Sequence, residues 1–270
     1  MVLGRLGRGW RNVRKVRRDL KHRLLGLPWM QVEPRDRFLF SYPRSGNTWL
    51  RHVVHHVTHG GNVDAMDALE DAQPTIDALE FGERLARMGD GPRFFKSHLP
   101  AAPYFLEGKV VYIVRDGRDV TLSYYDYFRH IHSYPGSFDE FMKKATTGWM
   151  RYGSWRDNVG SWLKYRDHPN MLLIRYEDMR REPVATAASV FAFCELEVSD
   201  EDIRAAVDAS SVEKVHATLR SWNGAQGTQF SGGASGGGKK GWRSRMTEEQ
   251  NRIFVDHAGD LLVSLGYPTE

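Results

Sequence analysis

The chain has 270 residues, 41% of them hydrophobic and 27% charged, which is the composition of a globular enzyme. It contains no run of eighteen apolar residues and no apolar leader with a small-residue cleavage site, so we expect neither a membrane-spanning helix nor a secretory signal. Cys194 is the single cysteine, which excludes an internal disulfide and favours a cytoplasmic protein, and its apolar neighbours predict a buried structural thiol.

The first residues carry most of the positive charge. Residues 1–23 hold nine Lys or Arg and one Asp, a net charge of +8, so the rest of the chain carries −4 of the total of +4. Leucines and Trp10 recur there at spacings of mostly three or four with arginines between them, which predicts a basic amphipathic helix within an N-terminal segment 1–36. A helix lying on the domain, a membrane-surface anchor formed by residues 1–25 and a nucleic-acid contact all fit this pattern. No motif for reading nucleic acid is present, so we expect no nucleic-acid partner.

Residues 37–270 alternate between strand-like and helix-like patterns. Strands are predicted at 37–42, 93–96, 109–114 and 171–174. Helices are predicted at 48–58, 64–71, 75–88, from 117 past 127, and at 153–167, 183–193, 200–208 and 247–264. This alternation predicts a single α/β domain with a central parallel sheet flanked by helices, a three-layer fold like that of the P-loop NTPases.

A glycine-rich stretch interrupts the last part of this domain. Residues 222–241 contain eight glycines, a composition typical of a flexible segment. Because a helical pattern resumes after it, a flexible linker and a mobile loop over a site both fit.

The first predicted strand leads into a turn of small, donor-rich residues, Tyr42–Trp49. Such a turn directs backbone N–H groups and hydroxyls toward one point, and the helix that begins near Thr48 adds the positive end of its dipole, so the turn is suited to hold a phosphate. It is not the usual triphosphate-binding loop. The G-x-x-x-x-G-K-[ST] spacing is absent, and the cation, Arg44, precedes Gly46 instead of following it.

Chemically active side chains also follow the other three predicted strands. His98 comes after the second, where an imidazole can act as a base near neutral pH. Arg115 follows the third strand, with Ser123 two helical turns further on; an arginine fork and a serine hydroxyl both suit phosphate oxygens. Tyr176 follows the fourth and offers a flat ring. The histidines at 52, 55, 56 and 59 lack Cys or carboxylate partners, so we expect no metal site.

Five blocks in order give the chain a resemblance to a known family. They are YPRSGNTW (42–49), KSHLP (96–100), RDGRDVTLSYY (115–125), the GSW to YEDM region (153–179) and GWRSRMT (241–247). Together they resemble the cytosolic type of PAPS-dependent sulfotransferase, whose donor is 3′-phosphoadenosine 5′-phosphosulfate (PAPS) and whose product is the corresponding bisphosphate (PAP). The resemblance covers residues 37–265, and within this family the chain resembles a bacterial member.

The resemblance implies roles for individual residues. Arg44, Ser45, Gly46, Asn47 and Thr48 would hold the 5′-phosphosulfate, Trp49 and Tyr176 the adenine, and Arg115 and Ser123 the 3′-phosphate. The implied catalytic residues are His98, as base in an in-line displacement, Arg44 and Ser123. No metal takes part.

The chain also departs from the family pattern. Arg44 stands where many relatives have lysine; an arginine would stabilise the leaving group by charge and hydrogen bonds, without giving up a proton. The family's Arg-Lys-Gly for the 3′-phosphate falls on 235–237, Ser-Gly-Gly, so two expected cations are missing. Lys239 and Lys240 are nearby cations, and we assign them to donor binding together with Gly241. Ser210, which lies just before the position where relatives often have an aromatic ring against the adenine, is also assigned to donor binding.

Two other functions compete with an O-sulfotransferase. A P-loop small-molecule kinase would have a similar fold but needs a different loop and Mg²⁺. A membrane-binding adaptor with a degenerate sulfotransferase fold would use only the basic N-terminal segment. The resemblance implies a hydroxyl-bearing acceptor, and the amphipathic segment favours a lipid-linked or hydrophobic alcohol over a carbohydrate. We expect a cytoplasmic protein that the amphipathic segment brings in part to the membrane surface.

Overall fold

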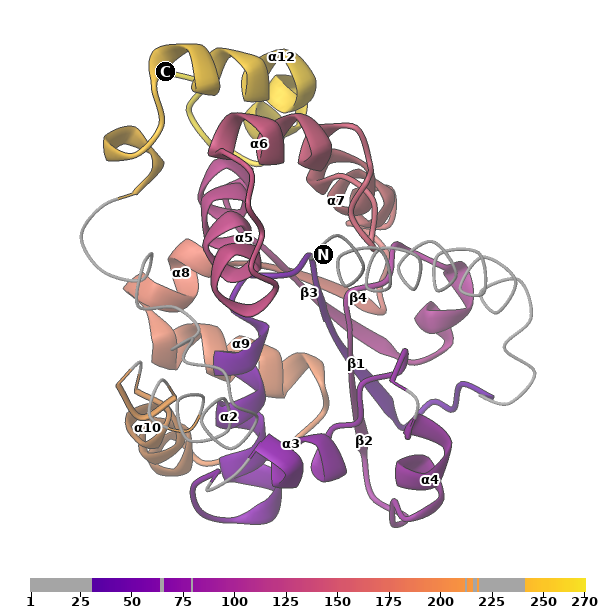
Figure 1. Ribbon diagram of the computed structural model, residues 1–270. Coiled ribbons are helices and arrows are strands. Elements are labelled where there is room, and N and C mark those ends of the chain that lie inside the picture. Colours follow the sequence, from indigo (N-terminus) through magenta and orange to yellow (C-terminus); the bar gives the residue numbers. More distant parts are fainter. Residues whose placement is uncertain (1–30, 64–65, 79, 212, 216–217, 219–240) are drawn as a thin grey trace.

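Four parallel strands form one sheet in the order β2-β1-β3-β4 (Figure 1). The strands are β1 (Asp36–Ser41), β2 (Arg93–Ser97), β3 (Lys109–Val114) and β4 (Met171–Arg175). This computed structural model describes residues 31–63, 66–78, 80–211, 213–215, 218 and 241–270. The basic N-terminal helix and most of the glycine-rich stretch, with Lys239 and Lys240, lie outside these residues, so those predictions stay predictions.

Helices cover both faces of the sheet. They are α2 (Asn47–His59), α3 (Met66–Ala72), α4 (Phe81–Ala86), α5 (Gly117–Ile131), α6 (Phe138–Thr146), α7 (Trp155–Leu163), α8 (Tyr176–Arg181), α9 (Pro183–Phe193), α10 (Asp200–Ala209) and α12 (Glu248–Ser264), with short 3₁₀ turns η1 (Pro103–Glu107) and η2 (Trp242–Ser244). In the described part of the chain, none of these helices is long and apolar enough to cross a membrane.

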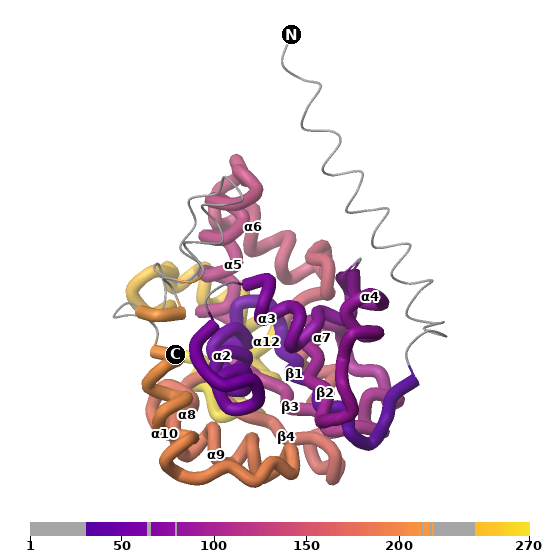
Figure 2. The backbone as a smooth tube through the Cα atoms, turned by 90° about the horizontal axis from the view of Figure 1, so that it is seen from below, coloured from indigo at the N-terminus to yellow at the C-terminus, as the bar shows by residue number. Residues whose placement is uncertain are grey.

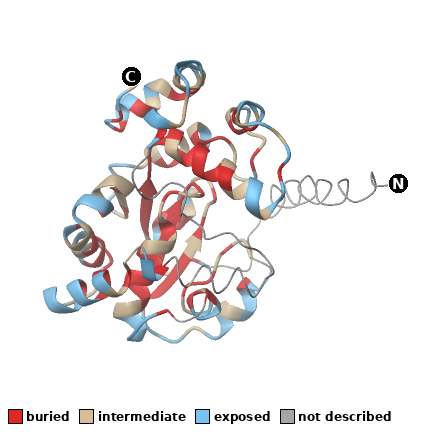
Figure 3. Ribbon diagram, turned by 60° about the vertical axis from the view of Figure 1, so that its left-hand side comes forward, coloured by how far each residue is buried: buried red, intermediate tan, exposed pale blue. Residues whose placement is uncertain are grey.

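The alternation of side chains along each strand divides the core into two clusters. Phe38 and Phe40 of β1 face α5, α6, α7 and α12, whereas Leu39 between them faces α2, α9 and α10. The helices on the second face pack on one another in the order α2, α10, α9, α8 (Figure 2). Because β1 is covered on both faces, it is buried along its whole length (Figure 3). The predicted three-layer α/β arrangement is confirmed.

Cys194 ends α9 inside the second cluster with no exposed surface. Burial raises the pKa of its thiol to about 12, so the predicted structural cysteine is confirmed.

One predicted helix is wrong in its first half. Residues 75–88 do not form a continuous helix, because Thr75 pairs with Lys96 of the edge strand β2 and the helix begins only at Phe81. The backbone N–H of Ile76 donates to the Lys96 carbonyl at 3.0 Å, and the Lys96 N–H donates to Pro74 at 3.0 Å. These bonds satisfy backbone groups at the open edge of β2. Their stabilisation outweighs the tendency of the side-chain pattern to form a helix.

Two helices were not predicted. Helix α6 starts with a capping box in which the Ser137 hydroxyl accepts from the Glu140 N–H and the Glu140 carboxylate accepts from the Ser137 N–H. This S-x-x-E signal is readable in the sequence. Helix α8 follows β4 with no intervening loop, so its short pattern merges with that of the strand.

Candidate functional site

The site lies at the carboxyl ends of the strands, at the point where the strand order reverses. Strand β2 lies on one side of β1 and β3 on the other, so the carboxyl ends of β1 and β3 form a topological switch point. Ligands of open parallel sheets bind in the crevice at such a point. The turn after β1 and Arg115 after β3 meet there, with His98 after β2 and Tyr176 after β4 on either side.

The turn between β1 and α2 has a backbone suited to an anion. Arg44 has φ 70° and Gly46, the N-cap of α2, has φ 98°, both in the left-handed region. A non-glycine residue in that region costs about 1–3 kcal/mol and is concentrated at functional sites. No side chain caps α2 and its first turn holds no acidic residue, so its N–H groups remain directed toward the turn.

Asn47 closes this turn against the strand. Its side-chain amide donates to the Leu39 carbonyl at 2.8 Å. The amide oxygen is buried and has no hydrogen-bond partner among the described residues. The hydrogen bond to Leu39 therefore holds the turn against β1, and the Asn47 amide oxygen is left as a buried acceptor without a partner among the described residues.

Two arginines meet beside the turn. The Nε of Arg44 donates to the Ser123 hydroxyl at 3.2 Å, and its guanidinium lies 5.3 Å from the centre of the Tyr127 ring. Nη1 of Arg115 donates to the Arg44 carbonyl at 3.1 Å. Burial lowers the pKa of Arg44, and the positive charge of Arg115 lowers it further, so an anion placed here relieves both effects.

Tyr176 is held against the turn and against Arg115. The Arg115 guanidinium lies 4.4 Å from the centre of the Tyr176 ring. A Cβ atom at Gly46 would come within 2.6 Å of Cδ2 of Tyr176, so only glycine allows this approach. Trp49, in the first turn of α2, packs on the same core cluster as Tyr176, which places two flat side chains near the start of α2 and α8.

His98 is held in its neutral form. Its Nδ1 lies 2.8 Å from the Ser41 carbonyl, which only accepts, so Nδ1 carries the proton and Nε2 keeps its lone pair. Burial, and next the charge of Lys96, hold the pKa of His98 well below 6.5. The imidazole is therefore unprotonated at neutral pH.

A polar cluster that the sequence did not predict supports His98. The Tyr152 ring lies 5.5 Å from the His98 ring, centre to centre, at an angle of 66°. Its hydroxyl donates to Asp77 at 2.6 Å, and Asp77 also accepts from the Ser97 hydroxyl at 3.2 Å and pairs with Arg151 at 2.9 Å. Asp77 lies in the segment that was wrongly predicted as helix, so no pattern linked it to His98.

Lys96 and Tyr127 also lie beside the site, Lys96 in β2 two residues before His98 and Tyr127 next to Arg44. Burial lowers the pKa of Lys96 to about 8, and the charge of Arg51 adds to the effect. Tyr127 is one helical turn after Ser123, so helix spacing alone would have pointed to it.

Most of the predicted residues that the structure describes come together. Arg44, Gly46, Arg115, Ser123 and Tyr176 are linked by the contacts above, and His98 joins them through the strand end at Ser41. The others of the turn are Ser45 and Asn47, which are buried, and Thr48 and Trp49, which are half-buried.

The later predicted residues are less well connected. Gly241 lies beside the start of α5, because the N–H of the next residue, Trp242, donates to Asp119 at 2.8 Å. Ser210 is buried at the C-terminal end of α10, and the contacts of the described residues do not join it to the site. No group of three or more metal-ligating side chains is found among the described residues.

Comparison with a family model and with known protein sequences gives matches that agree with one another. The family model of the sulfotransferase domain matches residues 34–265. Sulfotransferase 1B1 of Mus musculus is 31% identical, over 69% of this chain and 69% of that protein. Sulfotransferase 1B1 of Canis lupus familiaris is 28% identical, over 84% of each.

Two solved structures share the fold. Retinol dehydratase, crystallised with androsterone and PAP, superposes with a TM-score of 0.71 at 22% identity, over 86% of this chain and 82% of that one. Mouse sulfotransferase SULT7A1 in complex with PAP gives 0.68 at 24% identity, over 86% and 85%.

Proposed function

This chain belongs to the sulfotransferase family and is a PAPS-dependent sulfotransferase, and from that premise we propose how its residues transfer the sulfuryl group to an acceptor hydroxyl. One observation carries the proposal: a neutral histidine and two arginines, half-buried Arg44 and buried Arg115, flank the same anion-binding turn. The family match argues against the kinase alternative. An adaptor with a degenerate sulfotransferase fold would match the same family, so measured turnover is what distinguishes it from an enzyme.

The described residues fit the donor. Arg115 Nε is a buried hydrogen-bond donor without a partner among these residues, as expected of a group that an anionic ligand completes. We assign the 5′-phosphosulfate to the turn, Arg44 to Thr48, and the adenine to Trp49 and Tyr176. The 3′-phosphate is assigned to Arg115 and Ser123. Ser210, Lys239, Lys240 and Gly241 stay assigned to donor binding from the sequence.

His98 begins the reaction by removing a proton. Its Nε2 takes the proton of the acceptor hydroxyl while Nδ1 stays bonded to the Ser41 carbonyl, which fixes the tautomer and the direction of the ring. The donor supplies an electrophilic sulfur and a phosphate leaving group. The acceptor oxygen forms a bond to that sulfur as the bond from sulfur to the phosphate oxygen breaks, which yields a sulfate ester and PAP.

Arg44 stabilises the leaving group. Its guanidinium remains protonated, so it acts through charge and hydrogen bonds and not by proton transfer. Ser123 accepts the Arg44 Nε–H and thereby holds the side chain in place. The charge is in position before the reaction begins, which is the arrangement that makes such stabilisation effective.

The acceptor is proposed to be a small-molecule alcohol. The aromatic side chains of Tyr127 and Tyr152 lie next to Arg44 and His98 and offer an apolar surface with polar tips. Androsterone and retinol, which accompany PAP in structures of retinol dehydratase, are alcohols of this kind. A lipid-linked or carbohydrate acceptor stays a prediction.

Nucleotide affinity tests the proposal. We expect adenosine 3′,5′-bisphosphate to bind about 10- to 100-fold more tightly than AMP, because the 3′-phosphate adds charge-assisted hydrogen bonds. Isothermal titration calorimetry with both nucleotides measures the ratio. Equal affinities would contradict the assignment, and magnesium-dependent ATP consumption would point back to a kinase.

The dependence of rate on pH follows from the state of His98. Because its pKa lies well below 6.5, the base is available throughout the neutral range and is lost only as the pH falls through that lowered value. We therefore expect kcat at saturating donor and acceptor to decline only on the acid side, in assays from about pH 5 to about pH 9. A midpoint at or above 6.5 would contradict the environment described for His98.

A further inference from the structure

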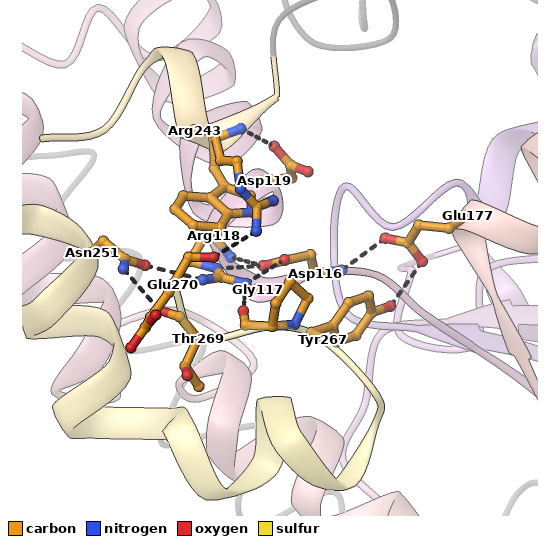
Figure 4. Close-up of polar contacts among 12 residues, drawn as sticks. Asp116, Gly117, Arg118, Asp119, Glu177, Arg243, Asn251, Tyr267, Thr269 and Glu270 are labelled. Atoms are coloured by element: carbon orange, nitrogen blue, oxygen red, sulfur yellow. Dashed lines mark hydrogen bonds and ion pairs between the residues drawn. The ribbon is translucent and has the colours of Figure 1, made fainter. Parts of the chain in front are cut away.

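The last residues of the chain contact the starts of α5 and α8, next to the residues assigned to binding PAPS. After α12 the chain turns back at Gly266, which has φ 74°. We call residues 267–270 the C-terminal segment. It lies against the start of α5 and against Glu177 in the first turn of α8, and Figure 4 shows the contacts.

One carboxylate joins the neighbours of Arg115 and Tyr176. The N–H of Asp116, next to Arg115, donates to Oε1 of Glu177 at 3.1 Å. Glu177, next to Tyr176, accepts the hydroxyl of Tyr267 at Oε2, at 2.8 Å (Figure 4). Arg115 lies over the Tyr176 ring, so these two bonds connect the backbone segments that carry this pair of side chains.

A buried arginine makes the second connection. Arg118 has no exposed surface, and its Nε and Nη2 donate to the Asp116 carboxylate at 3.0 and 2.7 Å. Nη2 also donates to the Pro268 carbonyl at 2.5 Å, and Nη1 donates to Asn251 at 3.0 Å. The C-terminal segment thus fixes the residue that caps α5, because the Asp116 side chain accepts the N–H of Arg118 at 3.0 Å.

The same connection reaches Gly241. The Arg118 guanidinium lies 3.7 Å from the centre of the Trp242 ring, and Trp242 is bonded through its N–H to Asp119. Arg243 donates to the Glu270 carbonyl at 2.6 Å. The chain that returns from the glycine-rich stretch is therefore attached to α5 and to the C-terminal segment together.

Hydrogen bonds to a carboxylate are stronger than those between neutral groups, and burial strengthens them further. Tyr267 is buried, and burial together with the negative charge of Glu177 raises the pKa of its phenol, so it remains a donor. The phenol of Tyr267 is therefore protonated throughout the pH range of the assays.

We propose that Tyr267 and Glu177 are positioning residues for the donor site: they hold Arg115 and Tyr176 in the arrangement that binds the 3′-phosphate and adenine. The inference rests on the proposed function. Neither side chain touches the reacting atoms, so their loss affects donor affinity and leaves the chemical step intact.

The test is Tyr267→Phe, which removes only the hydroxyl. We expect the Kd for PAP and the donor KM to rise about 3- to 10-fold, with kcat at saturating donor within about twofold of wild type. A purely structural role would lower the fraction of folded enzyme and leave Kd and KM unchanged, and that result would overturn the inference. Tyr125→Phe is the matched control, because its hydroxyl donates to the Gly136 carbonyl at 3.2 Å, outside this network.

A double variant tests the route through Glu177. If Tyr267 acts through Glu177, adding Tyr267→Phe to Glu177→Ala leaves the Kd for PAP at the value of Glu177→Ala alone. Independent, multiplying losses would overturn the route. A wild-type chain that does not bind PAP would overturn the proposed function itself, whereas equal Kd values for wild type and Tyr267→Phe would overturn only the positioning role.

Discussion

Replacing His98 with alanine is expected to lower kcat by about 10²- to 10⁴-fold, the usual effect of removing a general base. PAP should bind with wild-type affinity, because His98 bonds to the Ser41 carbonyl and not to the residues assigned to the nucleotide. Steady-state rates with a phenolic or steroid alcohol, together with calorimetric titration of PAP, measure the two quantities separately.

His130→Ala is the matched control for this variant. His130 also has its Nδ1 at a backbone carbonyl, 2.6 Å from that of Asp126, but it lies exposed on α5. It should retain the wild-type rate. If His98→Ala also retained its rate, another group would have to remove the acceptor proton, and the proposed mechanism would be wrong.

Replacing Arg44 with alanine is expected to affect both binding and rate. In the proposed mechanism the variant loses the cation that stabilises the leaving group, and removing such a donor from a preorganised site costs about 10²- to 10³-fold in kcat. It also loses one charge that attracts the donor, so the Kd for PAP should rise. Single-turnover rates at saturating donor separate the two effects.

Arg44→Lys divides the role of charge from that of the arginine fork. The lysine keeps the charge but not the Nε–H that bonds to Ser123, so we expect a rate between those of wild type and Arg44→Ala. Arg129→Ala is the control, since its guanidinium also lies over an aromatic ring, 5.8 Å from the centre of Tyr125, but on an exposed part of α5. An unaltered single-turnover rate in Arg44→Ala would remove this residue from the mechanism.

The positions of the strands were predictable because each is a short apolar run followed by polar residues. Val110 to Val114 is continuously apolar, as a strand covered on both faces requires, and Arg115 follows at once. Since parallel strands end at one edge of the sheet, the sequence order alone was enough to bring Arg44, His98 and Arg115 to a common place.

What failed were features that depend on contacts far apart in the chain. The pairing of Thr75 with Lys96 and the bond from Tyr152 to Asp77 join residues about 20 and 75 positions apart, which no local pattern encodes. Tyr267 was likewise beyond prediction, because its partner Glu177 lies 90 positions earlier. Local signals were sufficient for the four strands and for most of the helices, whereas the tertiary contacts determine how the site is supported.

The sheet places the aromatic side chains of the site on two separate cores. Tyr127 and Tyr152 pack on the cluster beneath α5 and α7, whereas Trp49 and Tyr176 pack on the cluster beneath α2 and α9. Substitutions in separate parts of a core have nearly independent effects on stability. If the proposed assignments hold, substitutions that change the acceptor side in the first core should leave the adenine side in the second core nearly unaffected.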